Sequence, residues 1–281
     1  MQLTQAQEAE VRKQKITAVF NSVAADYDSA ALRFFSFTAD SIVDYLQPQP
    51  GWKVLDVATG TGALALSLAQ IVGAQGRITG IDLSEAMLAK AEKNYKKMSI
   101  DNVDLLQMDA EQLEFRSDSF DAVTCSFGLF FIPDMLKALQ QWQRVTQPGG
   151  TVLFSSFTET AFELLGACFV DDLQQAGVDV ASKPLASARL HDADVCRELM
   201  AESDFVDVQQ VELQKGYHLK DENEWWDVVW GSAMRGLVMQ IPDAERDEFK
   251  RRHLAHVAAL CSKEGLWMNV GVRLTSGKVP A

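Results

Sequence analysis

Three carboxylates stand at or near the ends of short β-prone runs in the first half of the chain: Asp56, Asp82 and Asp109. Asp56 lies just before a glycine loop, Gly60-Thr61-Gly62, which opens a helical pattern. Glycines let the backbone approach a ligand closely, and the N-terminus of a helix offers free N–H donors. These residues therefore predict a ligand site in which carboxylates and a backbone loop face the same molecule.

The charge of that site favours a cationic nucleoside, although Gly60-x-Gly62-x-x-Ala65 also fits the dinucleotide fingerprint. The Asp56 carboxylate would repel a pyrophosphate but would suit a sulfonium or an ammonium. Asp82 follows Gly60 by 22 residues, where a carboxylate accepts from both ribose hydroxyls in either kind of cofactor. Asp109 distinguishes a cationic nucleoside from a dinucleotide, because its carboxylate could accept from an adenine amino group while Ala110 supplies a backbone amide. An NAD-dependent oxidoreductase is the alternative.

Strand and helix patterns alternate about every 25 residues up to position 157, which is typical of right-handed βαβ crossovers in a parallel sheet. This predicts an α/β, doubly wound fold, in which ligands bind beyond the carboxyl ends of the strands. Strands are expected over 54–57, 77–82, 103–108, 120–126 and 151–157, and helices over 4–23, 34–46, 63–72, 84–98 and 134–145.

The second half has a looser pattern. It predicts helical material to 178, a loop with Lys183 and Pro184, a helix over 193–200, an alternating stretch over 206–219, a Trp- and Met-rich helical segment over 224–259 and a last strand over 267–274. We predict that the N-terminal helices over 1–50 form part of a lid. The rest of the chain, 51–281, is predicted to be one domain with inserted cap helices at about 160–185 and 222–260.

Composition excludes several classes of function. The formal charge is −13, and so acidic a surface repels nucleic acids and anionic lipids. No apolar stretch approaches the ~18 residues of a membrane span, and the N-terminus lacks the apolar core of a signal peptide. The four cysteines form no C-x-x-C pair, so we expect reduced thiols and a cytoplasmic protein. The oligomeric state is left open.

Several motifs together resemble the class I S-adenosylmethionine (SAM)-dependent methyltransferases, and most closely the ubiquinone/menaquinone biosynthesis (UbiE-like) family. They cover about residues 15 to 157. The motifs are Phe20-Asn21-Ser22-Val23-Ala24-Ala25-Asp26-Tyr27-Asp28, Val54-Leu55-Asp56-Val57-Ala58-Thr59-Gly60-Thr61-Gly62, Gly80-Ile81-Asp82-Leu83-Ser84-Glu85-Ala86-Met87-Leu88, Met108-Asp109-Ala110-Glu111, Phe120-Asp121-Ala122-Val123, Ser126-Phe127-Gly128-Leu129 and Gln147-Pro148-Gly149-Gly150.

The resemblance implies a Rossmann-like methyltransferase sheet with helical N-terminal and C-terminal cap insertions, and SAM as cofactor. By the same resemblance, Thr61 meets the methionine part of SAM, Asp82 the ribose, and Asp109 and Ala110 the adenine. Ser126 lies near the transferred methyl and Tyr27 closes over the cofactor. The implied cofactor-binding set is Tyr27, Asp56, Gly60, Thr61, Gly62, Asp82, Leu83, Met87, Asp109, Ala110 and Ser126.

The predicted function is methyl transfer from SAM to carbon or oxygen of a small apolar or aromatic molecule. Such transfer is an in-line displacement in which the protein mainly aligns the reactants, and no residue stands out as a general base. A SAM-binding protein without transfer, acting as a scaffold or a rearrangement catalyst, is therefore a further alternative. The chain also departs from the quinone enzymes, which carry an Arg-Asn pair where it has Phe130-Phe131.

Two groups of side chains in the sequence have more than one interpretation. His191 and His218 could face the pocket, but lone histidines are more often surface or packing residues. His253 and His256 have ligand-like spacing without a third ligand nearby in sequence, so no metal site is predicted. An aromatic and thioether set either forms core or lines an acceptor pocket; its members are Phe34, Phe35, Phe37, Phe130, Phe131, Trp225, Trp226, Trp230, Met234 and Met239.

Overall fold

A seven-stranded sheet forms the centre of the computed structural model, which describes residues 4–180 and 185–281. Strand order is β3-β2-β1-β4-β5-β9-β6, with β1 to β5 parallel and β9 antiparallel to both of its neighbours. This confirms the α/β, doubly wound, Rossmann-like prediction. The strands are β1 (Lys53–Val57), β2 (Arg77–Asp82), β3 (Val103–Gln107), β4 (Phe120–Ser126), β5 (Thr146–Phe157), β6 (Val206–Gln214) and β9 (Gly271–Lys278).

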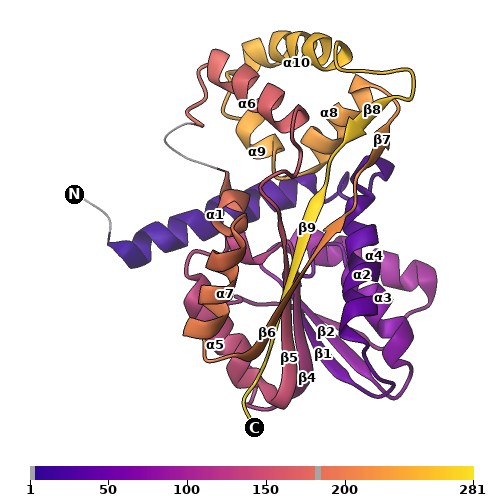
Figure 1. Cartoon of the computed structure of the whole chain (residues 1–281), viewed down its shortest axis with the longest axis vertical. Coiled ribbons are helices and arrows are strands. Elements are labelled where there is room, and N and C mark those ends of the chain that lie inside the picture. Colours follow the sequence, from indigo (N-terminus) through magenta and orange to yellow (C-terminus); the bar gives the residue numbers. More distant parts are fainter. Residues whose placement is uncertain (1–3, 181–184) are drawn as a thin grey trace.

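Helices cover both faces of this sheet (Figure 1), so its central strands are apolar on both sides. Val54, Leu55 and Val57 of β1 are fully buried. One face carries α2 (Phe34–Leu46), α3 (Ala63–Val72) and α4 (Glu85–Met98), and the other carries α5 (Met135–Val145) and α7 (Ala193–Glu202).

Side-chain caps start several of the helices that the sequence predicts. Thr4, Ser84 and Asp134 each accept a backbone N–H from the first turn of α1 (Gln5–Val23), α4 and α5, respectively. A capping side chain satisfies one of the free donors at the helix start. Each of these helices therefore begins one residue after the predicted position, because the expected first residue is the cap.

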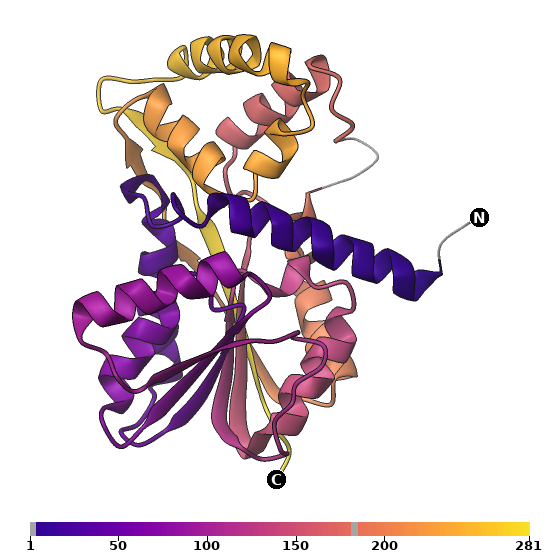
Figure 2. The same ribbon diagram turned by 180° about the vertical axis from the view of Figure 1, so that it is seen from behind.

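The late helices gather at one end of the sheet, where Figure 1 shows them as a separate layer, and α1 crosses between that layer and the sheet (Figure 2). This layer, called the cap below, contains α6 (Leu165–Gln175), α8 (Glu222–Gly231), α9 (Arg235–Val238) and α10 (Asp243–Ala258). Within residues 4–180 and 185–281, no helix is long and apolar enough to cross a bilayer.

Three elements of the second half differ from the prediction. The stretch 206–219 divides into β6 and β7 (Tyr217–Leu219), and the last strand divides into β8 (Leu266–Met268) and β9, with β7 and β8 pairing as a separate two-stranded sheet. Gln214 explains the break, because its side-chain oxygen accepts from the backbone N–H of Gly216 and Val270 in place of a strand carbonyl. The helical segment 224–259 is divided at Ser232, which is extended, and at Pro242. Lys183 and Pro184 of the predicted loop lie outside the described residues.

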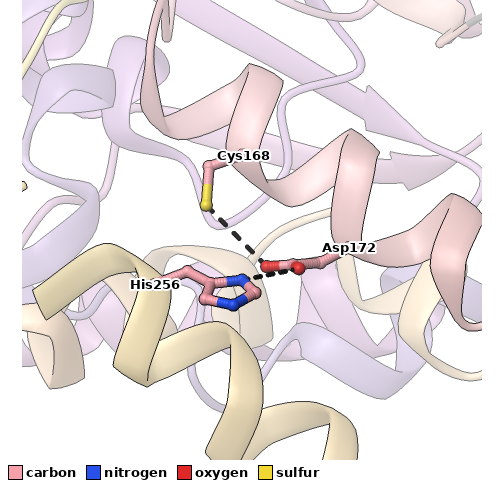
Figure 3. A group of neighbouring side chains, drawn as sticks. All are labelled: Cys168, Asp172 and His256. Carbon is pink, nitrogen blue, oxygen red and sulfur yellow. Dashed lines mark hydrogen bonds and ion pairs between the residues drawn. The ribbon is translucent and has the colours of Figure 1, made fainter. Parts of the chain in front are cut away.

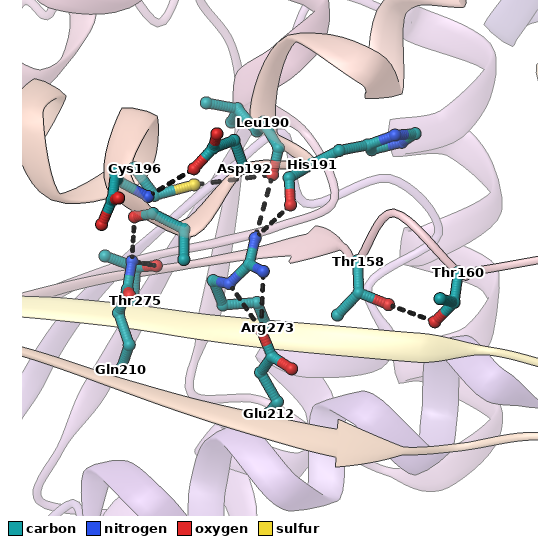
Figure 4. A network of polar contacts seen from close by, with 12 residues as sticks. Thr158, Thr160, Leu190, His191, Asp192, Cys196, Gln210, Glu212, Arg273 and Thr275 are labelled. Atoms are coloured by element: carbon teal, nitrogen blue, oxygen red, sulfur yellow. Dashed lines mark hydrogen bonds and ion pairs between the residues drawn. The ribbon is translucent and has the colours of Figure 1, made fainter.

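A buried arginine fastens the last strands to the segment before α7 (Figure 4). Arg273 of β9 pairs with Glu212 of β6 at 2.6 Å and donates to the backbone carbonyl of His191 at 2.6 Å. Burial lowers the pKa of the His191 imidazole, against the opposing charge of Glu159. His191 therefore belongs to a network that supports this part of the sheet.

Candidate cofactor and acceptor site

A cavity that is partly open to solvent lies at the carboxyl ends of β1 to β4. These strands are neighbours in the sheet, so the residues that follow them converge. Helix α1 closes the cavity from the other side with Lys13, Ile16 and Phe20. The predicted cofactor residues that line it are Tyr27, Gly60, Asp82, Leu83, Met87, Asp109, Ala110 and Ser126.

Backbone amides hold the Asp82 carboxylate at the end of β2. One oxygen accepts from the N–H of Gly60 at 2.9 Å, and the other accepts from the N–H of Ser84 at 2.8 Å. Burial raises the pKa of Asp82, while these amides and that of Leu83 oppose the shift. The carboxylate is therefore oriented before any ligand arrives, and each oxygen keeps a lone pair for a hydroxyl.

Lys13 of α1 is a cavity residue that sequence reasoning missed. Its Nζ lies 2.6 Å from an Asp109 carboxylate oxygen and 2.8 Å from one of Glu111. Burial lowers the pKa of Lys13, but the hydrogen bonds to both carboxylates outweigh it and the net shift is upward. The partners are 96 and 98 residues away in the chain, so no local pattern reveals them. The contact fastens α1 to the end of β3.

Asp56 does not line the cavity. Its carboxylate is buried behind the glycine loop and accepts from the hydroxyls of Thr59 at 2.6 Å and Thr124 at 2.8 Å. Burial raises its pKa to about 6, against these two hydrogen bonds. Asp56 thus holds the loop from behind, and a direct contact with the cofactor stays a prediction.

Thr61 and Gly62 also lie behind the cavity wall. Gly62 has φ +87°, and a Cβ there would lie 2.1 Å from the Tyr95 hydroxyl of α4. The backbone carbonyl of Thr61 accepts from the side chain of Asn94 at 3.1 Å. Both residues therefore serve the packing of α4 against the loop, and the predicted contact of Thr61 with the methionine part of SAM stays a prediction.

Aromatic rings form part of the cavity lining. Phe20 meets Phe131 edge-on, with ring centroids 5.1 Å apart, and meets Tyr27 edge-on at 6.2 Å. Tyr27 also stacks on Phe35 at 4.8 Å. Burial and then the negative charges of Asp82 and Asp28 raise the pKa of Tyr27, so its hydroxyl stays protonated at neutral pH. This wall suits an apolar or aromatic ligand.

The larger aromatic and thioether set is mainly core. Phe34, Phe130 and Trp225 are almost fully buried. Of the ten predicted members, only Phe131 lines the cavity among the described residues, and Phe37 and Met239 are more than 40% exposed. The described lining also contains no histidine.

The residues that line the cavity fit a cationic nucleoside. Asp82 and Asp109 supply carboxylates, and Lys13, the one lysine or arginine in the described lining, is paired with carboxylates. A pyrophosphate would meet uncompensated negative charge here, whereas a sulfonium would not. The sheet, its glycine loop and these strand-end acids define a class I SAM-dependent methyltransferase.

Comparison with known proteins gives the family. Residues 8–175 match the model of the ubiE/COQ5 methyltransferase family, and the chain belongs to that family. Its cofactor is SAM, and family membership decides against an NAD-dependent oxidoreductase.

Two curated relatives match the chain over somewhat more than half of its length. Aklanonic acid methyltransferase DauC of Streptomyces sp. (strain C5) is 33% identical over 166 residues, which are 58% of this chain and 76% of the relative. The ubiquinone/menaquinone biosynthesis C-methyltransferase UbiE of Brucella canis is 37% identical over 159 residues, which are 53% of this chain and 58% of the relative.

A solved structure extends the likeness in fold to almost the whole chain. The [4+2]-cyclase SpnF superposes with a TM-score of 0.59 at 18% identity, covering 99% of this chain and 98% of that one. At this identity the likeness shows the fold alone. The architecture, cap included, thus occurs in a protein that is named as a cyclase.

Proposed function

We propose that this methyltransferase transfers the methyl group of SAM to carbon or oxygen of a small apolar or aromatic molecule. One observation carries the proposal: a single cavity is lined both by strand-end carboxylates and by the rings of Phe20, Tyr27 and Phe131. The carboxylates suit the nucleoside, and the rings of Phe20 and Phe131 suit the acceptor. A cavity covered by α1 leaves little room for a polymer, which favours a small molecule over nucleic acid or protein.

The cofactor roles follow from the cavity wall. In the proposed complex Asp82 accepts from the ribose hydroxyls, Asp109 and Ala110 meet the adenine, and Ser126 lies near the transferred methyl. Gly60, Leu83 and Met87 line the same region. We further propose that residues 1–50 form part of a lid, with the cap helices as insertions in the remaining domain, and that Lys13 fastens α1 when the lid is closed.

The chemical step needs alignment more than acid–base catalysis. SAM supplies a methyl group whose sulfonium leaving group is already activated. In the proposed complex Ser155 orients Ser126, because the Ser155 hydroxyl lies 3.3 Å from that of Ser126 and accepts from the backbone N–H of Phe127 at 3.0 Å. Phe20 and Phe131 exclude water from the acceptor side. No described histidine lies in the cavity to serve as a base, which favours acceptors whose nucleophilic atom is already deprotonated or strongly activated.

The names of the relatives support the same class of acceptor. One is named for aklanonic acid and the other for ubiquinone and menaquinone biosynthesis, and both are small molecules. A cytoplasmic location is part of the proposal, and the four free thiols support it.

The test uses purified protein, SAM labelled in the methyl group, and acceptors of several classes. We expect S-adenosylhomocysteine together with label on an aromatic small molecule such as a quinol or a hydroxylated anthraquinone. Label on tRNA or a peptide but on no small molecule would refute the proposed acceptor. SAM binding without S-adenosylhomocysteine from any acceptor would instead favour the alternative of a SAM-binding rearrangement catalyst, which shares its fold with SpnF.

Phe131→Ala tests the acceptor wall. It removes a ring that meets Phe20 in the cavity, so KM for the acceptor should rise at least about tenfold, the order of the loss of a buried aromatic contact. The dissociation constant for SAM should change less than twofold. Phe37→Ala is the matched control, because Phe37 is 41% exposed and lies outside the cavity lining. Equal effects of both variants on the acceptor would contradict the assignment of this wall.

A further inference from the structure

Three potential metal ligands meet on the cap, away from the cavity at the strand ends (Figure 3). Cys168 and Asp172 are one helical turn apart on α6, and His256 comes from α10. His256 Nδ1 lies 2.8 Å from one Asp172 oxygen, and Cys168 Sγ lies 3.8 Å from the other. One ligand atom from each residue lies within 4.8 Å of the other two.

The Asp172 carboxylate is buried, yet no lysine or arginine side chain among the described residues pairs with it. Arg252 reaches only the backbone carbonyl of Asp172, at 3.3 Å. Ionised carboxylates are costly to bury without a positive partner. A positive partner for this carboxylate would therefore have to be one of its two imidazoles, His253 or His256, or a bound cation.

His253 does not supply that charge. Its Nε2 lies 2.9 Å from Trp225 Nε1, which is only a donor, so Nε2 accepts and Nδ1 carries the hydrogen. Nδ1 then donates to Asp172 at 2.7 Å, and the ring is neutral. A neutral imidazole that orients a carboxylate in this way is the arrangement found behind metal ligands. The two histidines therefore have different roles, although their spacing in the sequence is ligand-like.

We propose that Cys168 Sγ, the Asp172 carboxylate and His256 Nδ1 bind a divalent transition-metal ion of the Zn²⁺ type, which ties α6 to α10. A sulfur, nitrogen and oxygen donor set suits Zn²⁺, whereas Mg²⁺ and Ca²⁺ prefer oxygen alone. Three protein ligands leave one tetrahedral position for water. The three residues share a surface hollow with Leu164, Asp171, Gln175 and Leu260, and the His256 side chain is 48% exposed, which provides a path for entry.

Cobalt(II) is the probe, because it reports thiolate ligation by a near-ultraviolet charge-transfer band and tetrahedral geometry by its visible bands. The reduced full-length protein should bind one Co²⁺ per chain with both signals, and Zn²⁺ should abolish them by competition. Cys168→Ser should remove the charge-transfer band, and His256→Gln should weaken Co²⁺ binding at least tenfold. Absence of the band in the wild-type protein, or its persistence in C168S, would overturn the proposal.

Matched controls separate this site from other thiols and imidazoles. Cys261→Ser changes a partly buried thiol that donates to the backbone carbonyl of Val257, and His218→Gln changes an exposed histidine. Both should leave the cobalt spectrum unchanged. Zn²⁺ should raise the Tm of the wild-type protein, because it binds the folded state, and it should not do so in C168S or H256Q. Equal Tm shifts in wild type and both variants would place the metal elsewhere and refute the site.

Discussion

Asp82→Ala is the sharpest test of the cofactor assignment. Both carboxylate oxygens already accept backbone N–H groups, at 2.9 Å from Gly60 and 2.8 Å from Ser84, and the side chain lines the cavity. The orientation is thus fixed in advance, and ribose hydroxyls would donate to the remaining lone pairs. Hydrogen bonds to a charged acceptor contribute about 1.5–3 kcal/mol each. Even with replacement by water, loss of two should weaken SAM binding at least about tenfold, or about 1.4 kcal/mol.

Isothermal titration with SAM measures this effect, and two further variants make it interpretable. Asp82→Asn keeps one accepting oxygen, so its affinity should fall between those of wild type and D82A. Asp104→Ala removes a carboxylate near the start of β3, where it is about half exposed and pairs with Arg77 on the surface, so SAM affinity should not change. A dissociation constant of D82A within twofold of wild type, with the fold intact by circular dichroism, would refute the ribose assignment.

Two further predictions concern buried charges. Burial raises the pKa of Asp56 from 3.8 to about 6, so ionisation above pH 6 costs the folded state about 3 kcal/mol, and wild type should gain stability relative to Asp56→Asn as pH falls from 6 to 4. Urea unfolding of both proteins between pH 4 and 8 checks this, and a difference independent of pH would contradict it. Lys13→Met leaves Asp109 and Glu111 side by side without their cation, so it should destabilise the fold by about 1–3 kcal/mol and speed proteolysis within α1. Lys15→Met, on an exposed position of the same helix, should do neither, and equal cleavage rates would disprove the fastening role.

Most of the parallel sheet is predictable from the sequence because its signals are local. Apolar runs of strand length, capping residues such as Ser84 and Asp134, and turns between them lie within a few residues of the elements they define. The divided strands of the second half are not predictable in this way. Their break depends on the Gln214 side chain, which bonds to the backbone of Val270 across 56 residues, and the pattern of alternating residues continues through it.

The residues of the site also fall into two groups: those that local sequence signals identify, and those that only long-range packing brings together. Residues after neighbouring parallel strands must converge, which is why the sequence could group Asp82 and Asp109, whereas Asp56, which was grouped with them, does not line the cavity. Lys13 reaches this group only through the packing of α1 over the sheet. The Cys168, Asp172 and His256 cluster likewise depends on how α6 meets α10, since Asp172 and His256 are 84 residues apart.

The two walls of the cavity also explain why relatives predict the cofactor better than the acceptor. The cofactor wall is made by strand ends, whose positions follow from the sheet itself. The aromatic part of the lining comes from α1, which packing positions over the sheet, and from η2 (Leu129–Phe131), which follows β4. In the proposed function Phe131 belongs to the acceptor side of the cavity. The strand-end acids are separate from it, so a change of acceptor would require no change in how SAM is held.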